Sequence, residues 1–282
     1  MNKELSIIVT SYKNPSVLRL CLESLKKNVL NRNFEILVFD SATEEETEMM
    51  MREDFPEIHF FPFENNLGFS RLVNRGLREA RGNFILILNA DIIIERRSVD
   101  ILLQELKKNS QIGLIGPRLL SFDGRTQPSC FRFYTLPVII YRRTFLGRFR
   151  FAKREIDKFL YKDKDLEKPQ EVDWLMGSAI MTSRKAFEKV GFMEENFGFM
   201  YFEDVDWCRR FWEKGFKVVY YPLARMFHYH GKGSASQNVL KGILLNRLTR
   251  EHIKSAFKYF LKYLGKKNPH MERVQSANLN LE

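Results

Sequence analysis

The chain has 282 residues, of which 44% are hydrophobic, enough for one large domain or a domain with an appendage. Its 46 lysines and arginines exceed its 35 aspartates and glutamates, and the net charge of +11 favours nucleic acid, a phosphorylated ligand or an anionic membrane surface as partner. Three widely spaced cysteines fit neither a zinc finger nor a disulfide framework, and no apolar run approaches the roughly 20 residues that span a bilayer. We therefore expect reduced thiols in a cytoplasmic protein that is soluble or peripheral to a membrane, without a signal peptide.

Strand-like and helix-like segments alternate through the first ninety or so residues. Strands are expected at 5–12, 35–40, 58–63 and 84–88, and helices at 17–25 and 68–82. Thr43 and Glu46 fit a capping box for a short acidic helix after the second strand. Alternation of this kind is typical of an α/β fold with a parallel sheet covered by helices.

The pattern is less regular in the second half of the chain. A helix is expected over 98–108, another after Ser183, and a strand over 216–222. Residues 131–164 are basic and aromatic-rich without a clear period, and residues 239–267 read as a strongly basic helix. Only the last dozen residues or so look disordered.

Two acidic side chains follow successive expected strands. Asp40 ends "EILVFD", and Asp91 interrupts the apolar stretch "FILILNADIII". One such residue would usually belong to a turn, but the carboxyl ends of parallel strands open onto one edge, where α/β sheets bind ligands. Neither a P-loop nor a GxGxxG follows the first strand, which argues against a P-loop nucleotidase and a dinucleotide dehydrogenase.

Three further carboxylates occur together in "YFEDVDWCRR", namely Glu203, Asp204 and Asp206. They could simply be the acidic N-terminus of a helix, which the helix dipole favours. The neighbouring aromatic residues would limit their solvation, however, and poor solvation raises a carboxylate pKa into the range of a general base. We therefore favour a functional interpretation.

His228 and His230 alternate in "HYHGKGS" and would share one face of a strand. A single histidine more often packs or caps than binds a metal. Here an imidazole could join Asp91 in binding a divalent metal, and the glycine-rich basic loop at 231–234 could hold phosphate.

Taken together, these segments resemble family 2 glycosyltransferases, which have the GT-A fold and use nucleotide-sugar donors. "SIIVTSYKNPSVLRLCLESL" is similar to the opening strand and helix of that family. "NNLGFSRLVNRGLREARGNFILILNAD" is similar to its donor-site signature, and "GSAIMTSRKAFEKVGFMEENFGFMYFEDVDWCRR" to its acceptor-side block. The resemblance implies a Rossmann-like, mostly parallel central sheet flanked by helices, with a basic helical C-terminal extension.

The resemblance also implies roles for individual residues. Asp40 would accept a hydrogen bond from the pyrimidine ring of the donor, and Asp204 would be the general base of an inverting displacement. Asp91 and His228, with His230 as the substitute, would hold Mg²⁺ or Mn²⁺ against the donor diphosphate. Other donor contacts would come from Thr10, Tyr12, Asn66, Gly68, Asn74 and Asn89, and acceptor contacts from Trp174, Gly177 and Glu203.

One position departs from the family pattern. Asn89 stands where D-x-D motifs carry their first aspartate, and Ala90 replaces the usual proline of the L-N-P-D subgroup. An amide is a weaker metal ligand than a carboxylate, so Asn89 is expected to bind the donor ribose or a water molecule on the metal.

The subgroup resembles bacterial rhamnosyltransferases of cell-surface polysaccharide synthesis, which use lipid-linked acceptors on the cytoplasmic membrane face. We accordingly expect a catalytic domain over 1–236, with a donor half to about 120 and an acceptor half after it, and a C-terminal segment over 237–282. Residues 131–154 and 252–267 interleave basic and aromatic residues, as membrane-surface segments do. The later segment would equally suit packing on its own catalytic domain or on a second subunit, as in a homodimer.

Two other functions compete with transfer of a sugar. A catalytically inactive nucleotide-sugar-binding scaffold would explain Asn89, although Asp40, Asp91 and Asp204 are intact. A nucleic-acid-binding protein is supported by the charge alone, because no recognised nucleic-acid motif accompanies it, and we expect no nucleic-acid partner.

Overall fold

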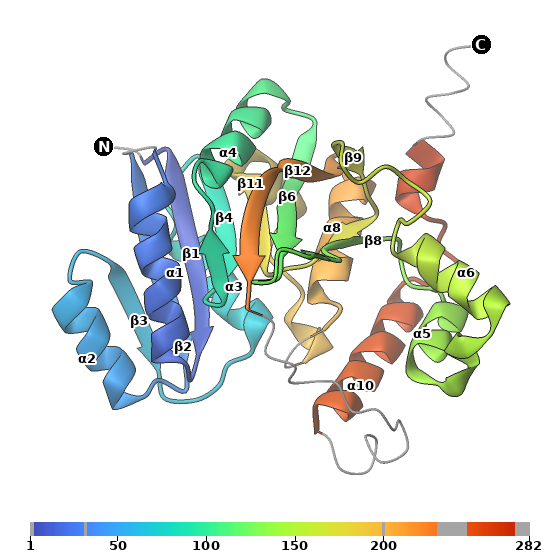
Figure 1. The fold of residues 1–282 in the computed structure, drawn as a ribbon, viewed down its shortest axis with the longest axis horizontal. Helices are drawn as coiled ribbons and strands as arrows, with labels where there is room; N and C mark the ends of the chain where they lie inside the picture. Colours follow the sequence, from blue (N-terminus) through green and yellow to red (C-terminus); the bar gives the residue numbers. More distant parts are fainter. Residues whose placement is uncertain (1–2, 31–32, 199–200, 230–246, 274–282) are drawn as a thin grey trace.

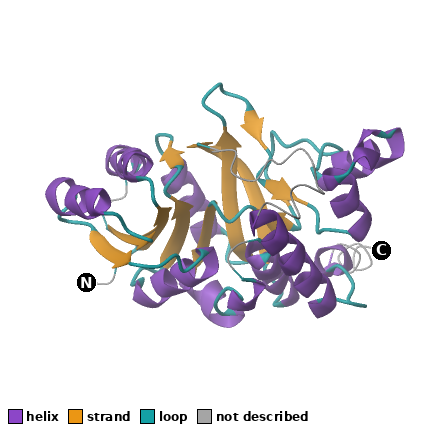
Figure 2. Ribbon diagram, turned by 90° about the horizontal axis from the view of Figure 1, so that it is seen from below, coloured by secondary structure: helices purple, strands orange, loops and turns teal. Residues whose placement is uncertain are grey.

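The computed structural model describes residues 3–30, 33–198, 201–229 and 247–273, which build a twisted sheet with helices on both faces (Figures 1 and 2). The strands are β1 (Leu5–Tyr12), β2 (Phe34–Ser41), β3 (His59–Phe63), β4 (Phe84–Asn89), β5 (Ile92–Ile94), β6 (Ile112–Leu120), β7 (Thr126–Gln127), β8 (Cys130–Phe131), β9 (Gln170–Glu171), β10 (Trp174–Leu175), β11 (Ala179–Ser183) and β12 (Lys217–His228). The helices are α1 (Pro15–Asn28), α2 (Glu45–Asp54), α3 (Phe69–Glu79), α4 (Ser98–Lys108), α5 (Leu136–Arg143), α6 (Arg150–Phe159), α7 (Arg184–Val190), α8 (Glu203–Glu213) and α10 (Arg247–Lys262), with 3-10 turns η1 (Phe145–Arg148) and η2 (Glu195–Phe197).

The main sheet has the strand order β3-β2-β1-β4-β11-β6-β12-β5. Strands β3, β2, β1 and β4 are mutually parallel, and β6 and β12 are parallel to each other. Strand β11 runs antiparallel between β4 and β6, and β5 antiparallel to β12. The α/β fold with a mixed, mostly parallel sheet is thus confirmed.

Alternating residues of β1 enter two separate cores, as the period of a buried strand requires. Ile7 and Val9 pack with the buried face of α1, whereas Ile8 packs with α3 on the opposite side of the sheet. Helix α3 lies so close to β1 that a Cβ on Gly76 would come within 2.5 Å of the Ile8 side chain. This close packing fixes the helix that leads out of the candidate donor loop.

The expected capping box at Thr43 and Glu46 is wrong. Helix α2 begins after Glu44, whose side chain makes no capping hydrogen bond. Instead the Thr43 hydroxyl donates to the carbonyl of Asp40 (3.0 Å) and accepts from the amide of Phe63 (3.2 Å). Thr43 therefore ties the ends of β2 and β3 together at the edge that carries Asp40.

Helix α3 also ends earlier than expected, at Glu79 rather than at Gly82. Gly82 lies in the following turn, where an added Cβ would be 2.5 Å from the backbone nitrogen of Ser6. The three cysteines are buried and free, as expected. Among the described residues, none of the helices has the length and apolarity needed to cross a bilayer.

Helix α10 packs against the body of the protein with one face. Tyr259 and Tyr263 are buried there, and the buried Ser255 hydroxyl donates to the carbonyl of Phe197 in η2 (2.6 Å). The boundary expected at 236/237 lies outside the described residues, as do His230 and the loop at 231–234.

Candidate active site

Asp40 occupies the carboxyl end of β2, beside Ser11 of β1. Its side chain is fully buried, yet neither carboxylate oxygen has a hydrogen-bond partner among the described residues. Burial raises the pKa of this carboxyl above its ordinary value. A buried carboxylate without partners is costly, and a hydrogen-bond donor at this position would offset that cost.

The segment before α3 closes over the same edge. The Ser41 hydroxyl, at the end of β2, accepts from the amide of Leu67 (2.7 Å), and the Asn66 side chain accepts from the amide of Gly68 (3.0 Å). Gly68 has φ 83°, which an L side chain rarely adopts. Asn66 and Gly68 therefore shape this loop beside Asp40 through backbone contacts.

Thr10 and Asn89 are paired residues on β1 and β4. The Thr10 hydroxyl donates to the Asn89 side-chain oxygen (3.1 Å), which orients the amide. Tyr12, at the end of β1, is 52% exposed and available to a ligand. Thr10, Tyr12 and Asn89 lie at the carboxyl ends of β1 and β4, on the same edge of the sheet as Asp40.

Asp91 and His228 meet although 137 residues separate them. Strand β5 pairs with β12 so that His228 faces Ile92, and the His228 Nε2 lies 3.4 Å from the Asp91 Oδ2. The Asp91 Oδ1 is buried without a hydrogen-bond partner among the described residues. A carboxylate and an imidazole so placed fit a small divalent cation.

Gln127 orients the side chain of His228. Its side-chain oxygen lies 2.9 Å from the His228 Nδ1, and its amide donates to the His228 carbonyl (3.0 Å). An acceptor at Nδ1 favours the tautomer with the proton there, so that Nε2 keeps its lone pair toward Asp91. The described residues contain no group of three or more metal-ligating side chains, so a cation here would need further ligands from substrate or water.

The three acids of α8 have different environments. Asp204 accepts hydrogen bonds from the amides of Gly177 (3.1 Å) and Val205 (2.9 Å), and burial raises its pKa. Glu203 is buried, and one of its oxygens has no partner in the portion of the chain that the structure describes; its pKa is raised by burial and by the charge of Asp204. Asp204 is therefore oriented by two backbone amides, while burial favours its protonated form more than in water.

Asp206, in contrast, is fully buried and committed to structure. It accepts from the Tyr263 hydroxyl (2.7 Å), pairs with Lys262 (2.6 Å) and binds the guanidinium of Arg210 (2.9 Å). Tyr263 and Lys262 belong to the α10 region, so the third acid of the sequence motif anchors the C-terminal helix to α8. A charge this well paired has no capacity left for a substrate.

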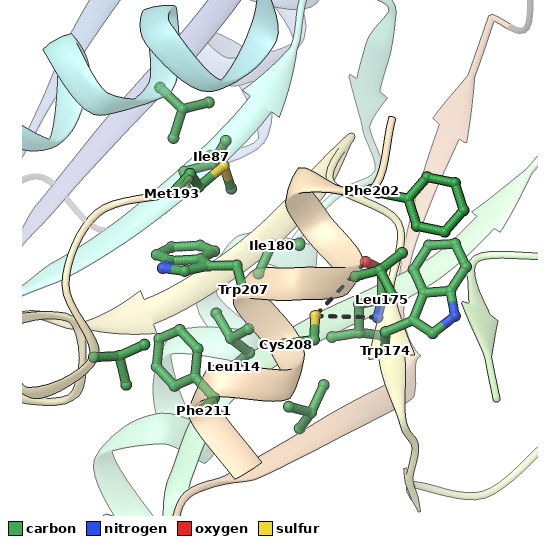
Figure 3. Close-up of a cluster of buried hydrophobic side chains, with 14 of the residues drawn as sticks. Ile87, Leu114, Trp174, Leu175, Ile180, Met193, Phe202, Trp207, Cys208 and Phe211 are labelled. Atoms are coloured by element: carbon green, nitrogen blue, oxygen red, sulfur yellow. Dashed lines mark hydrogen bonds between the residues drawn. The ribbon is translucent and has the colours of Figure 1, made fainter. Parts of the chain in front are cut away.

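Beneath the acids, α8 packs into the core shown in Figure 3, through Trp207, Cys208 and Phe211. The Cys208 sulfur accepts from the amide of Leu175 in β10 (3.4 Å) and lies 3.9 Å from its carbonyl. The backbone immediately before α8 is strained, because Tyr201 and Phe202 have φ 81° and 72°. His252 stacks on Tyr201 (4.5 Å between ring centroids), so α10 supports the turn that leads to Asp204.

Gly177 and Ser178 join the two halves of the site. The Ser178 carbonyl accepts from the amide of Asn89 (2.9 Å), while the preceding Gly177 donates to Asp204. A Cβ on Gly177 would meet the Phe69 ring at 2.9 Å, so only glycine fits between α3 and α8. The strand end of Asn89 and the candidate base are therefore linked through two consecutive residues.

Two further expected residues are buried and hydrogen-bonded within the protein. Trp174 is buried, donates from its indole to the Arg132 carbonyl (2.8 Å) and stacks on Tyr134 (5.6 Å between ring centroids). Asn74 is buried. Its side-chain amide donates to the backbone carbonyl of Met193 and to the carboxylate of Glu195, and its side-chain oxygen accepts from the backbone amide of Met193. Their polar groups are engaged within the protein, so direct substrate contacts from these two side chains stay a prediction.

Sequence reasoning missed Gln127 and Ser178. Gln127 lies in a two-residue strand with no period to reveal it, and Ser178 contributes only a backbone carbonyl, which no side-chain pattern reports.

Comparison with known proteins gives a consistent result. The family model described as Glycosyl transferase family 2 matches residues 6–191. An N-acetylglucosaminyl-diphospho-decaprenol L-rhamnosyltransferase of Mycobacterium tuberculosis is 28% identical over 241 residues, covering 81% of this chain and 77% of its own. The rhamnosyltransferase WbbL of Escherichia coli K12 is 24% identical, covering 96% of this chain and 98% of its own.

Among solved structures, GalNAc-T7 with UDP, GalNAc and Mn²⁺ matches with a TM-score of 0.62. The match covers 80% of this chain and 43% of the other, at 16% identity. This likeness shows that the two share the GT-A fold.

Proposed function

The chain belongs to glycosyltransferase family 2, whose members are inverting enzymes, and we propose that it transfers a sugar from a UDP- or dTDP-sugar to a lipid-linked glycan acceptor in cell-surface polysaccharide synthesis. The rhamnosyltransferases of M. tuberculosis and E. coli, similar over most of this chain, make dTDP-rhamnose the first donor to test. The observation that carries the proposal is the buried carboxylate of Asp40, which has no hydrogen-bond partner within the described part of the chain, on the same sheet as the Asp91–His228 pair.

We assign the donor site to the carboxyl ends of β1, β2 and β4. The carboxylate of Asp40 would accept a hydrogen bond from the ring N–H of a pyrimidine, which would relieve the cost of its burial. Asn89, oriented by Thr10, would bind the ribose. The loop at 65–68 would cover the nucleotide.

Asp91 and His228 would hold Mg²⁺ or Mn²⁺, with Gln127 fixing the imidazole. Such a cation offsets the negative charge that develops on the departing nucleoside diphosphate. The carboxylate of Asp91 and the imidazole of His228 both suit these ions as ligands, and substrate phosphates commonly complete a metal site that has so few protein ligands.

Asp204 would act as the general base. As the acceptor oxygen forms its bond to the anomeric carbon, the bond from that carbon to the diphosphate breaks and the hydroxyl proton passes to Asp204. This single displacement inverts the anomeric configuration. The raised pKa of Asp204 strengthens it as a base, and Glu203, buried beside it, would face the acceptor.

Release of nucleoside diphosphate from UDP- and dTDP-sugars tests the proposal, in the presence of Mn²⁺ and an N-acetylglucosaminyl-diphosphate polyprenol. Asp204→Asn should abolish transfer and retain nucleotide binding. Asp54→Asn, an exposed carboxylate at the end of α2, is the matched control and should transfer at the wild-type rate. Transfer by Asp204→Asn at the wild-type rate would exclude this residue as the base, and nucleotide binding without transfer by any form of the protein would favour a scaffold.

A further inference from the structure

An aromatic cluster stands on the outside of the protein in the α5–η1–α6 region. Phe145, Phe149 and Phe151 are 70%, 49% and 57% exposed. The ring of Phe149 nevertheless packs against both of the others, with its centroid 6.4 Å from that of Phe145 and 5.8 Å from that of Phe151. Exposed phenylalanines gathered in this way mark an interaction site more often than scattered apolar residues do.

Helix α10 presents a second apolar face to solvent. Ile253, Phe257 and Leu261 are 49%, 65% and 56% exposed, and their spacing of four residues puts them on one side of the helix. Leu264, just beyond the helix, is 78% exposed. The opposite side of α10 is buried through Tyr259 and Tyr263. The helix therefore has two apolar faces, one packed on the protein and one exposed to solvent.

These two exposed regions are neighbours. Figure 1 places α5, α6 and α10 together at one end of the molecule, opposite α2 and β3. The guanidinium of Arg143 in α5 contacts the His252 ring in α10. We call the exposed side chains of α5, η1 and α6 together with the outer face of α10 the outer surface.

The outer surface is strongly basic. Residues 142–162 contain eight lysines and arginines and two acidic residues, and α10 contains five and one. Arg148, Arg150, Lys153 and Arg154 are exposed and make no ion pair with any of the residues described. Three of them line a hollow along α6, together with Lys158 and Lys162 and with two acidic residues, Asp157 and Asp163.

We propose that the outer surface docks onto an anionic phospholipid bilayer. Phenylalanine and leucine interleaved with lysine and arginine suit the boundary between headgroups and acyl chains, where apolar side chains insert and cations meet lipid phosphates. A symmetric pairing of two copies through this surface would instead place like charges opposite each other. Charge complementarity therefore selects a bilayer over a second copy.

The docking surface reaches the candidate active site. Arg142 of α5 donates to the Tyr134 hydroxyl (3.2 Å), and the Tyr134 ring contacts Phe202 (4.9 Å between centroids), two residues before Asp204. Docking would thus bring the candidate base close to hydroxyls carried by membrane lipids. The docking itself does not depend on which sugar or acceptor the protein uses.

Vesicle flotation of the full chain tests the proposal without any substrate. The protein should bind vesicles of phosphatidylcholine with 30% phosphatidylglycerol and fail to bind pure phosphatidylcholine, and 0.5 M NaCl should weaken the binding. The triple variant Phe145→Ala/Phe149→Ala/Phe151→Ala should lose more than tenfold in affinity. Equal binding to neutral vesicles, or no binding to anionic ones, would overturn the proposal.

A second variant and a control complete the experiment. Arg148→Gln/Arg150→Gln/Lys153→Gln leaves the aromatic cluster in place and should also lose more than tenfold, since each charge near the surface contributes about fivefold. The matched control changes three exposed apolar residues at the other end of the molecule, as Leu20→Ala/Leu30→Ala/Met49→Ala. This control variant should bind the anionic vesicles within twofold of wild type.

A second copy of the chain on the outer surface would give a different result from a bilayer. A dimer in sedimentation velocity that the phenylalanine variant dissociates, without vesicle binding, would reassign the outer surface to a second copy and overturn the proposal. Nucleotide binding measured on the same samples separates this test from that of the transferase function, because these residues lie outside the donor site. Full nucleotide binding by a variant also shows that it is folded.

Discussion

Asp40→Asn should stabilise the protein while weakening its binding of a pyrimidine nucleotide. The carboxylate is fully buried, and neither oxygen has a partner among the described residues. An unsatisfied buried group costs about 1–3 kcal/mol, and more when it is charged. The isosteric amide removes the charge but keeps polar atoms without partners, so we expect a net gain of about 1 kcal/mol in the free energy of unfolding at neutral pH.

The gain should depend on pH in a defined direction. Burial raises the pKa of Asp40 in the folded state, so the folded protein binds a proton more readily than the unfolded chain does. The free energy of unfolding of the wild type therefore falls as pH rises through that raised pKa, and protonation of Asp40 in acid restores it. The stability advantage of Asp40→Asn should be small at low pH and largest at neutral pH.

The same substitution should weaken nucleotide binding. A hydrogen bond to a charged acceptor contributes about 1.5–3 kcal/mol, which corresponds to a loss of about 10- to 150-fold in affinity for UDP or dTDP. Thermal unfolding would show the stability change as an increase of about 2–4 °C in Tm for a domain of this size, and calorimetric titration would show the affinity. A lower Tm with unchanged nucleotide affinity would refute the reasoning and make Asp40 a structural residue.

Three other predictions concern the remaining parts of the site. Because burial raises the pKa of Asp204, transfer should decline in acid at a pH above the ordinary aspartate range near 4; a pH–rate profile that breaks at the ordinary value would count against Asp204 as the base. Gln127→Leu should weaken Mn²⁺ affinity by about 10- to 100-fold through the lost orientation of His228, and unchanged affinity in a Mn²⁺ titration would remove Gln127 from the metal site. Tyr263→Phe deletes the hydroxyl that donates to the buried Asp206 and should lower the free energy of unfolding by about 1.5–3 kcal/mol in guanidinium titrations; a loss below 0.5 kcal/mol would show that α10 is held by other contacts.

The sequence predicted the parallel half of the sheet well because local patterns carry that information. Buried parallel strands are continuous apolar runs, and helices between them have a clear period. Asp40 could be placed at a strand end for the same reason, since its position depends only on where β2 stops. Its lack of partners could not be predicted, because this depends on the side chains of neighbouring strands.

Residues whose roles depend on distant partners were harder to interpret. The pairing of β5 with β12 brings His228 to Asp91, and no local period reveals a pairing across 137 residues. Glu203, Asp204 and Asp206 occur together in the sequence, yet Asp206 is the structural member because the α10 region supplies Tyr263 and Lys262 to it. Side-chain identity alone could not distinguish the acid that faces the site from the acid that holds the helix.

The central claim is that Asp40 and Asp91 belong to one metal-dependent site for a pyrimidine nucleoside diphosphate. Calorimetric titration with a panel of nucleoside diphosphates, with and without Mn²⁺, tests it most directly. We predict binding of UDP or dTDP that requires Mn²⁺ and is lost in Asp91→Ala. Absence of binding by every pyrimidine diphosphate in the presence of Mn²⁺, with the protein shown to be folded by its thermal transition, would contradict the assignment of this site.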